Sequence, residues 1–92
     1  MIQSFADKDT EALYHGKSVR RYLPFLRIAE RKLAQLNNAR SLQDLGAIPG
    51  NRLEALRGKR RGEHSIRINE QFRVVFRWRE DGPYDVRIED YH

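Results

Sequence analysis

The chain has 92 residues, 18 of them Lys or Arg and 13 Asp or Glu, which gives a formal net charge of +5. This length predicts one domain with a small core, and the absence of cysteine excludes disulfides and thiolate chemistry. The opening MIQSFADKD has no apolar signal-peptide core and no long apolar run follows, so we expect a cytoplasmic protein that does not span a membrane. The excess of positive charge favours a polyanion or an acidic protein as partner.

The first half of the chain is predicted to be mostly helical. Residues 1–5 suit a short edge strand. Asp9 is positioned to cap a helix that ends at Gly16. Pro24 fits the first turn of a second helix, which ends at residues 37–38. The apolar stripe of this second helix consists of Leu26, Ala29, Leu33 and Leu36, while Arg27, Arg31 and Lys32 are expected to lie away from it. Residues 41–46 suit a single capped turn.

The second half is predicted to be a sheet. Strands are expected at 52–57, 63–68, 72–79 and 84–90, with turns at 49–51, 58–62, 69–71 and 81–83. The short connections favour antiparallel pairing. The whole order is β-α-α-β-β-β-β, which is an α+β fold with two helices packed on a mainly antiparallel sheet.

The central hairpin, residues 63–79, has two faces because side chains alternate along a strand. One face is apolar and consists of His64, Ile66, Ile68, Phe72, Val74, Phe76 and Trp78. The other face carries arginines and consists of Ser65, Arg67, Asn69, Arg73, Val75, Arg77 and Arg79. We expect the helices to cover the apolar face, with Trp78 in the core.

A set of basic residues is expected to converge on the other face of the sheet. Its members are Arg57, Lys59, Arg60, Arg61, Arg67, Arg73, Arg77 and Arg79. Guanidinium groups bind phosphate in a planar, bidentate way. The alternative is an ordinary solvated face on which acidic side chains neutralise the basic ones. The acids available are Glu63, Glu70, Glu80 and Glu89, and they are too few to neutralise the set. The pattern therefore favours an anion site.

The chain ends in an acid, a phenol and an imidazole, namely Asp90, Tyr91 and His92. They follow a predicted core strand directly, so they are candidates for proton transfer, stacking and orientation. The alternative for His92 is a frayed terminus. The three histidines have no metal-ligand spacing, so no metal site and no cofactor are expected.

Four segments together resemble the HigB toxins of the RelE superfamily. These are the opening MIQSF, the run PGNRLEALRG, the run HSIRINEQFRVVF and the ending IEDYH. The likeness covers nearly the whole chain, so it implies one RelE-like domain over residues 1–92. It also implies a toxin of a type II toxin–antitoxin system, held inactive by a HigA-like antitoxin with a helix-turn-helix domain. Operator DNA would be bound only through that antitoxin.

The resemblance implies a ribosome-dependent endonuclease that cuts mRNA in the A site by metal-independent attack of a ribose 2′-OH. Arg73 would stabilise the charge that develops on the phosphate. His92 would be the main acid/base group, Tyr91 would stack on a base or orient the site, and Asp90 would orient His92. Lys59, Arg60, Arg61, Arg67, Arg77 and Arg79 would bind RNA.

The chain departs from its relatives at two places. Where some relatives have Lys followed by Gly, it has Arg57-Gly58, and arginine suits charge stabilisation better than proton transfer. A relative carries Arg near the hairpin tip where this chain has Asn69, and Arg67 is the nearest replacement. Three other functions stay open: a ParE-like gyrase inhibitor, an RNA-binding module that does not cleave, and a toxin relic that only binds its antitoxin.

Overall fold

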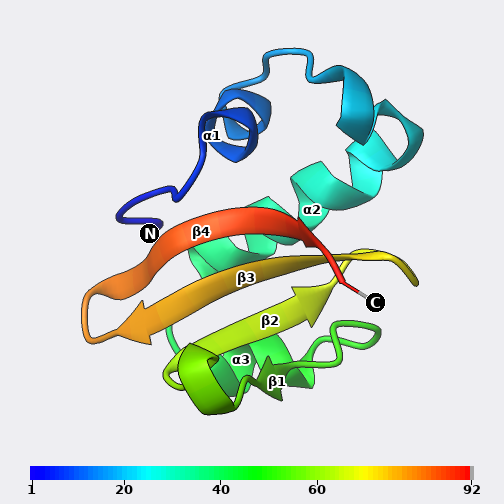
Figure 1. The fold of residues 1–92 in the computed structure, drawn as a ribbon. Coiled ribbons are helices and arrows are strands. Elements are labelled where there is room, and N and C mark those ends of the chain that lie inside the picture. The colour runs from blue at the N-terminus through cyan, green and yellow to red at the C-terminus, as the bar shows by residue number, and fades with distance from the viewer. Residues whose placement is uncertain (92) are drawn as a thin grey trace.

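A computed structural model describes residues 1–91 of the chain. It has an α+β fold in which helices cover one face of a four-stranded antiparallel sheet with strand order β1-β2-β3-β4 (Figure 1). The helical elements are α1 (Lys8–Tyr14), the 3₁₀ helix η1 (Arg20–Phe25), α2 (Leu26–Asn38), α3 (Leu42–Ala47) and the 3₁₀ helix η2 (Gly58–Arg60). The strands are β1 (Glu54–Ala55), β2 (Glu63–Arg67), β3 (Phe72–Arg79) and β4 (Gly82–Asp90). None of the described helices is both long and apolar enough to cross a membrane.

The β2–β3 hairpin confirms the predicted alternation. Ile66 lies opposite Val74 and Ser65 lies opposite Val75, so the two apolar sets share one face. Asn69 closes the tip, where its Oδ1 accepts hydrogen bonds from the backbone N–H groups of Gln71 and Phe72, each at 2.8 Å. This Asx-type closure fixes the register and so fixes which face each later residue of β3 occupies.

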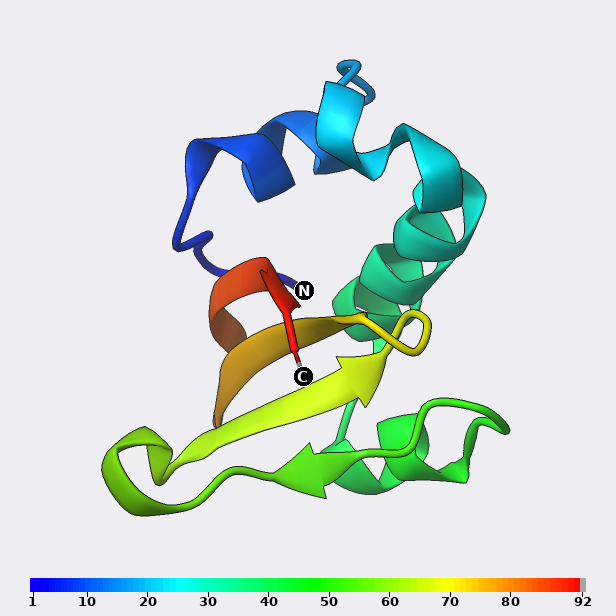
Figure 2. The same cartoon turned by 45° about the vertical axis from the view of Figure 1, so that its right-hand side comes forward.

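The core lies between the predicted apolar face and the helices. Ala29, Leu33 and Leu36 of α2 are fully buried, as predicted for the stripe, and Trp78 packs partly buried against the same core. The buried sheet residues in this core are Ile66, Ile68, Val74, Phe76, Val86 and Ile88. Figure 2 shows the fold turned by 45°: α2 and α3 lie behind the sheet. None of the described α-helices covers the opposite face, which we call the helix-free face and which only the short 3₁₀ helix η2 borders at one end.

The helix starts differ from the prediction. Asp7, not Asp9, caps α1, and its Oδ1 accepts from the N–H of Thr10 at 2.7 Å. Pro24 lies inside η1, and α2 begins two residues later. Tyr22 and Phe25 are both buried, and their three-residue spacing matches one turn of a 3₁₀ helix. The capped turn predicted at 41–46 is confirmed as α3, with Ser41 as its N-cap.

Lys32 was expected to lie away from the apolar stripe of α2, but it is buried. It follows Ala29 by three residues and precedes Leu36 by four, which places it on the flank of the apolar stripe. Its Nζ donates to Oδ1 of the buried Asn51. Burial lowers the pKa of Lys32 below its ordinary value, and repulsion from Arg31 and Arg67 acts in the same direction.

Two predicted strands are shorter than expected. The strand predicted at 52–57 is reduced to Glu54–Ala55. Before it, Arg52 has a φ of 45° and cannot belong to an extended ladder. Residues 1–5 form only an isolated bridge, in which Phe5 pairs with Val86 in parallel. In contrast, β4 starts at Gly82, earlier than predicted, and bulges at Asp85, whose φ is 55°.

Candidate active site

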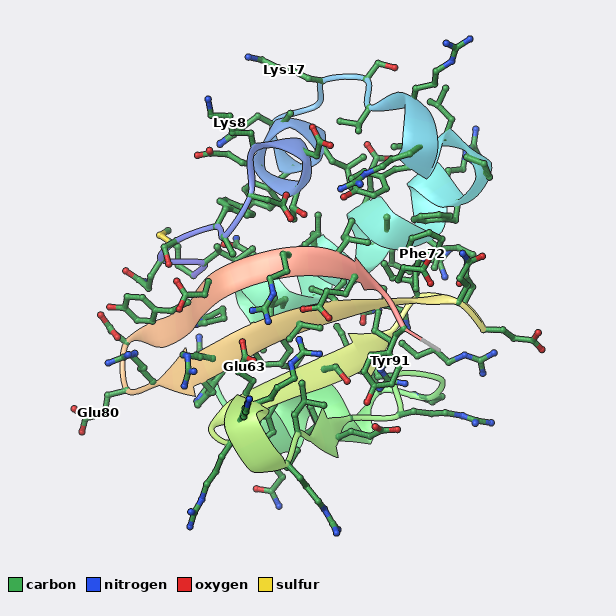
Figure 3. All side chains as sticks on the ribbon, viewed as in Figure 1. Lys8, Lys17, Glu63, Phe72, Glu80 and Tyr91 are labelled. Carbon is green, nitrogen blue, oxygen red and sulfur yellow. The ribbon has the colours of Figure 1, made fainter. Side chains whose placement is uncertain are left out.

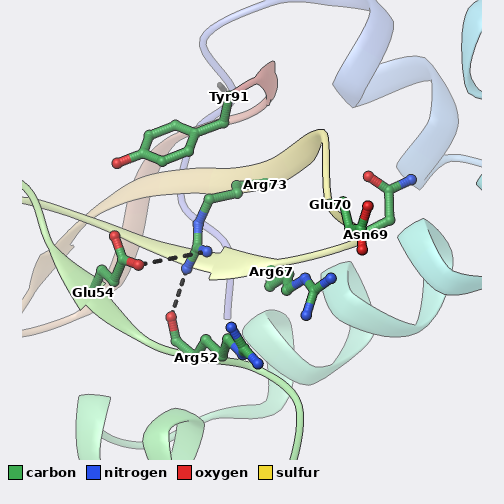
Figure 4. A pocket seen from close by; sticks show the side chains of 7 residues that line it. All are labelled: Arg52, Glu54, Arg67, Asn69, Glu70, Arg73 and Tyr91. Carbon is green, nitrogen blue, oxygen red and sulfur yellow. Dashed lines mark hydrogen bonds and ion pairs between the residues drawn. The ribbon is translucent and has the colours of Figure 1, made fainter.

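An open pocket of about 390 Å³ lies on the helix-free face of the sheet, close to the hairpin tip (Figure 4). Its lining residues are Arg52, Glu54, Arg67, Asn69, Glu70, Arg73 and Tyr91. A second pocket of about 340 Å³ shares Glu54 and Tyr91 with the first and adds Ala55, Leu56, Arg57 and Arg60. Because two residues line both pockets, we treat them as one groove, which we call the sheet groove.

Arg73 forms the floor of the sheet groove and is only 7% exposed. Its Nε donates to Oγ of Ser65 at 2.7 Å, and its Nη2 donates to the carbonyl oxygen of Arg52 at 2.5 Å. Nη1 lies 3.7 Å from Oε1 of Glu54, on the side that opens to the groove. Burial lowers the pKa of Arg73 from its ordinary value, while Glu54 opposes this by favouring the charged form. The guanidinium is thus held rigidly, with one edge toward the groove.

Tyr91 covers the same guanidinium from above. Its ring centroid lies 5.5 Å from Cζ of Arg73, which is cation–π distance. Its backbone N–H donates to the carbonyl oxygen of Gln71 at 2.5 Å, and Nε2 of Gln71 donates to Oδ2 of Asp90 at 3.0 Å. Figure 1 shows this end of the chain crossing β3. The hairpin tip therefore holds the chain end so that the Tyr91 ring lies beside Arg73. Asp90 lies opposite Phe72 and is bound to Gln71, and it is not among the residues that line the groove. His92 lies outside the described residues.

Arg52 and Glu54 line the groove but were not predicted as site residues. They follow Asn51, whose carbonyl oxygen accepts from the N–H of Arg67 at 2.7 Å and whose Nδ2 donates to the carbonyl oxygen of Leu45 at 3.1 Å. Together with the bond from Lys32, these contacts lock the segment before β1 against the core. The locked segment then presents the Arg52 carbonyl to Arg73. The alternation of residue types along the sequence does not predict this contact between the Arg52 carbonyl and Arg73.

The predicted basic set does not all gather in one place. The sheet groove is lined by Arg57, Arg60, Arg67 and Arg73. Lys59 and Arg61 are exposed on the turn beside it. Arg77 and Arg79 lie toward the other end of β3, where Arg77 pairs with Asp85 at 3.8 Å and Arg79 stacks on Tyr84. Arg79 follows Arg73 by six positions along the extended strand, a distance of about 20 Å.

Comparisons with known proteins give the family. A model of the RelE-like toxin HigB of type II toxin–antitoxin systems matches residues 3–92. The chain is also 39% identical over 80 residues to the toxin HigB-1 of Vibrio cholerae serotype O1 (strain ATCC 39315 / El Tor Inaba N16961), covering 85% of this chain and 84% of that relative. The chain belongs to the HigB-like toxin family. As a type II toxin, it has an antitoxin as its partner.

Arg60 and Arg87 of this HigB-like toxin each form ion pairs with the same two acids, Glu63 and Glu89. These four ion pairs make a ring, which we call the charge ring. Arg60 binds Glu63 through Nε at 3.3 Å and also binds Glu89. Arg87 binds Glu63 at 2.6 Å and Glu89 at 2.8 Å. Hydrogen bonding by Arg87 lowers the pKa of Glu63, although burial opposes this. The acids therefore neutralise part of the basic face, and Arg60, predicted to bind RNA, is already ion-paired to two acids of the toxin itself.

The histidines of the HigB-like toxin were expected to hold no metal. His64 faces the core side, stacked on Phe76 with the ring centroids 6.2 Å apart, and burial lowers its pKa. His15 packs edge-on against Phe5 and Tyr14. Within residues 1–91, no three His, Cys, Asp or Glu side chains are grouped so that they could bind a metal ion. The absence of a metal requirement stays a prediction.

Proposed function

We propose that this HigB-like toxin is an endoribonuclease that cleaves translated mRNA in the ribosomal A site. The observation that carries the proposal is the pairing of Arg73 and Tyr91 in the sheet groove. A guanidinium suits an RNA phosphate, and the aromatic ring beside it suits the neighbouring base. The open shape of the groove fits a single-stranded segment, and the helix-free face leaves room for the ribosome around it.

In the proposed reaction, the ribose 2′-oxygen attacks the adjacent phosphorus and the bond to the 5′-oxygen breaks. Negative charge grows on the phosphate oxygens during this step. Arg73, with Arg67 and Arg57 along the groove, stabilises that charge. We propose that the reaction needs no metal, because these arginines supply the positive charge that a metal would otherwise provide.

We further propose that His92 transfers protons and that Asp90 orients it. An imidazole has an unperturbed pKa of about 6.5, which suits proton transfer at neutral pH. Deleting His92 is expected to lower cleavage by about 10²-fold and to change the free energy of unfolding by no more than about 1 kcal/mol. Full cleavage by both the deletion variant and His92→Gln would remove His92 from the mechanism.

The proposed partners are the ribosome with its mRNA and a HigA-like helix-turn-helix antitoxin, which alone would contact operator DNA. The exposed Lys59 and Arg61, next to the groove, are proposed to bind RNA backbone. The antitoxin is proposed to mask the basic face or to hold the toxin away from the ribosome. Its association rate should therefore fall as salt rises.

The test is to express the toxin without antitoxin and to map RNA ends by primer extension on a message whose start codon is either intact or mutated. New ends within codons of the translated message, absent from the untranslated one, are expected. Changed DNA supercoiling with intact mRNA would instead indicate a ParE-like gyrase inhibitor. Ribosome binding without new RNA ends would indicate an RNA-binding module.

A further inference from the structure

A lysine lies buried behind the sheet groove, on the side of the sheet that the helices cover. Lys32 belongs to α2 and is 7% exposed, and the positive charge of Arg67, which lines the groove, repels it. Figure 3 shows Tyr91 in front of the sheet and α2 behind it. A buried ammonium is costly, and an apolar side chain of similar volume often packs at least as well in its place. The burial of Lys32 therefore needs an explanation beyond packing.

The ammonium of Lys32 fixes the orientation of the Asn51 side chain. Asn51 is fully buried. Its amide oxygen accepts from Nζ of Lys32, and its amide nitrogen donates to the carbonyl oxygen of Leu45 at 3.1 Å. Because an ammonium can only donate and a carbonyl can only accept, these two contacts exclude the flipped orientation of the amide. The main chain of Asn51 is bound as well: its N–H donates to the carbonyl oxygen of Ile48 at 3.2 Å, and its carbonyl oxygen accepts from the N–H of Arg67 at 2.7 Å.

The next residue, Arg52, extends these contacts into the groove. Its φ of 45° is rarely adopted by a residue with a side chain, so the segments on both sides must hold it. Asn51 holds it on one side, and the pairing of β1 with β2 holds it on the other. In this conformation the carbonyl oxygen of Arg52 accepts from Nη2 of Arg73 at 2.5 Å, which Figure 4 shows as a dashed line. The contacts that begin at Lys32 therefore end at the guanidinium of Arg73.

We propose that Lys32 is a positioning residue for RNA cleavage: through Asn51 and the loop that follows it, Lys32 fixes the guanidinium of Arg73 at the reacting phosphate. This inference rests on the nuclease function proposed above. The bond to the Arg52 carbonyl is shorter than the two bonds from Arg73 to Ser65, which measure 2.7 and 3.3 Å. A shift of this carbonyl therefore moves the cation, and a displacement of about 1 Å at a reacting group can lower the rate by about 10²-fold.

The proposal predicts that Lys32→Met affects the rate and not the binding. Methionine keeps the length and the packing of the side chain but removes the donor to Asn51. The single-turnover cleavage rate should fall by about 10-fold or more, because Arg73 no longer meets the transition state in the right place. Binding to the programmed ribosome should stay within about threefold of the wild type, because the cations of the groove are all still present.

The experiment measures cleavage of an mRNA positioned in the A site of purified ribosomes, and binding to the same mRNA with a 2′-deoxynucleotide at the cleavage site, which cannot react. Arg31→Met is the matched control: it removes one positive charge from the preceding position of α2, where the side chain is exposed. Val86→Ala is the control for stability, because Val86 is fully buried and its backbone pairs with residues 4–6, away from the groove. Both controls should cleave at the wild-type rate well below their urea midpoints.

Nitrogen-15 NMR of the free toxin observes Arg73 in the absence of RNA. The Nε–H signal of Arg73, identified by its loss in Arg73→Lys, should be sharp in the wild type and in both controls, because Nε is bound to Ser65 in a buried site. In Lys32→Met this signal should shift and broaden. A role of Lys32 in general stability would leave the signal unchanged below the urea midpoint.

Any of four results would overturn the proposal. A wild-type rate for Lys32→Met removes Lys32 from the reaction and leaves the nuclease function intact. A slower rate with an unchanged Arg73 signal shows that Lys32 acts elsewhere in the fold. An equal loss of rate in Val86→Ala, at a similar urea midpoint, shows an effect of stability alone. No cleavage by the wild-type toxin on any translated message overturns the nuclease function and this inference with it.

Discussion

The guanidinium of Arg73 lies beneath the ring of Tyr91, with Cζ 5.5 Å from the ring centroid, although 18 positions separate the two residues in the chain. Two backbone arrangements create this contact. The β3–β4 register places Arg73 opposite Glu89, and the bond from the Tyr91 N–H to Gln71 then folds the chain end back over β3. Through this contact, the most buried cation of the groove lies against the aromatic ring of Tyr91.

Replacement of Arg73 should reduce both stability and activity. The sequence alone suggests that Arg73→Ala leaves the fold intact, but the side chain is buried and satisfies Ser65 and the Arg52 carbonyl. Arg73→Ala is therefore expected to lose about 1–3 kcal/mol of unfolding free energy. Cleavage should fall by about 10²-fold or more if the cation stabilises the transition state.

Ser65→Ala is the matched control for this prediction. It removes the acceptor of the Arg73 Nε bond but leaves the cation in place. Urea unfolding should show a comparable loss of stability, while cleavage should fall by no more than about tenfold. Equal losses of cleavage in Ser65→Ala and Arg73→Ala, measured well below their unfolding midpoints, would show that Arg73 acts through the fold alone.

Tyr91 should contribute to RNA binding through its ring. Tyr91→Ala is expected to weaken binding by about 10- to 100-fold, because stacking of a base on an aromatic ring contributes about 1–3 kcal/mol. Tyr91→Phe keeps the ring over Arg73 and should bind within about threefold of the wild type. Titration of the programmed ribosome with labelled toxin measures both. If Phe and Ala weaken binding equally, the hydroxyl and not the ring makes the contact.

The sequence predicted the parts of the fold that depend on local patterns. The alternation of Ile66, Val74 and Phe76 indicated the hairpin and its buried face, and Ser41 marked a helix start that the structure confirms. Each of these patterns can be recognised within a few consecutive residues of the sequence. The position of Tyr91 near Arg73 followed from the same hairpin together with the family resemblance, whereas Asp90 lies opposite Phe72 and does not line the groove.

The rest of the groove depends on contacts between distant segments. Arg52 reaches Arg73 through its backbone, and it does so because Lys32 and Asn51 lock the preceding loop against the core. Neither the burial of Lys32 nor the positive φ of Arg52 can be predicted from a periodic pattern in the sequence. The charge ring likewise joins η2, β2 and β4 and spans β3, so counting acids and bases along the chain could not assign its partners.

Arg60 and Arg61 are adjacent arginines for which we expect different behaviour. Arg60 is partly buried and ion-paired to Glu63 and Glu89, so Arg60→Ala should lower the free energy of unfolding by about 1–2 kcal/mol. Arg61 is exposed, so Arg61→Ala should change it by less than about 0.5 kcal/mol. If Arg61 contacts an RNA phosphate, its loss should reduce the salt slope of RNA binding by about 1. Equal stabilities for the two variants would show that the charge ring does not hold η2.

The charge ring should also make stability depend on pH in the acid range. The pKa of Glu63 is lowered in the folded state, chiefly by the hydrogen bond from Arg87, so its contribution is fully present above the unfolded pKa of about 4.3. As pH falls below that value, the unfolded chain takes up the proton first, and stability decreases until the folded state is protonated as well.

Urea unfolding of the wild type and of Glu63→Gln from pH 7 to pH 3 measures this contribution. The wild type should be more stable by about 2 kcal/mol at pH 7, and the difference should shrink below about pH 4. His64, whose pKa is lowered by burial, adds a loss of stability below its unfolded pKa of about 6.5 in both proteins, so the comparison cancels it. A difference that stays constant down to pH 3 would show that ionisation of Glu63 does not stabilise the fold.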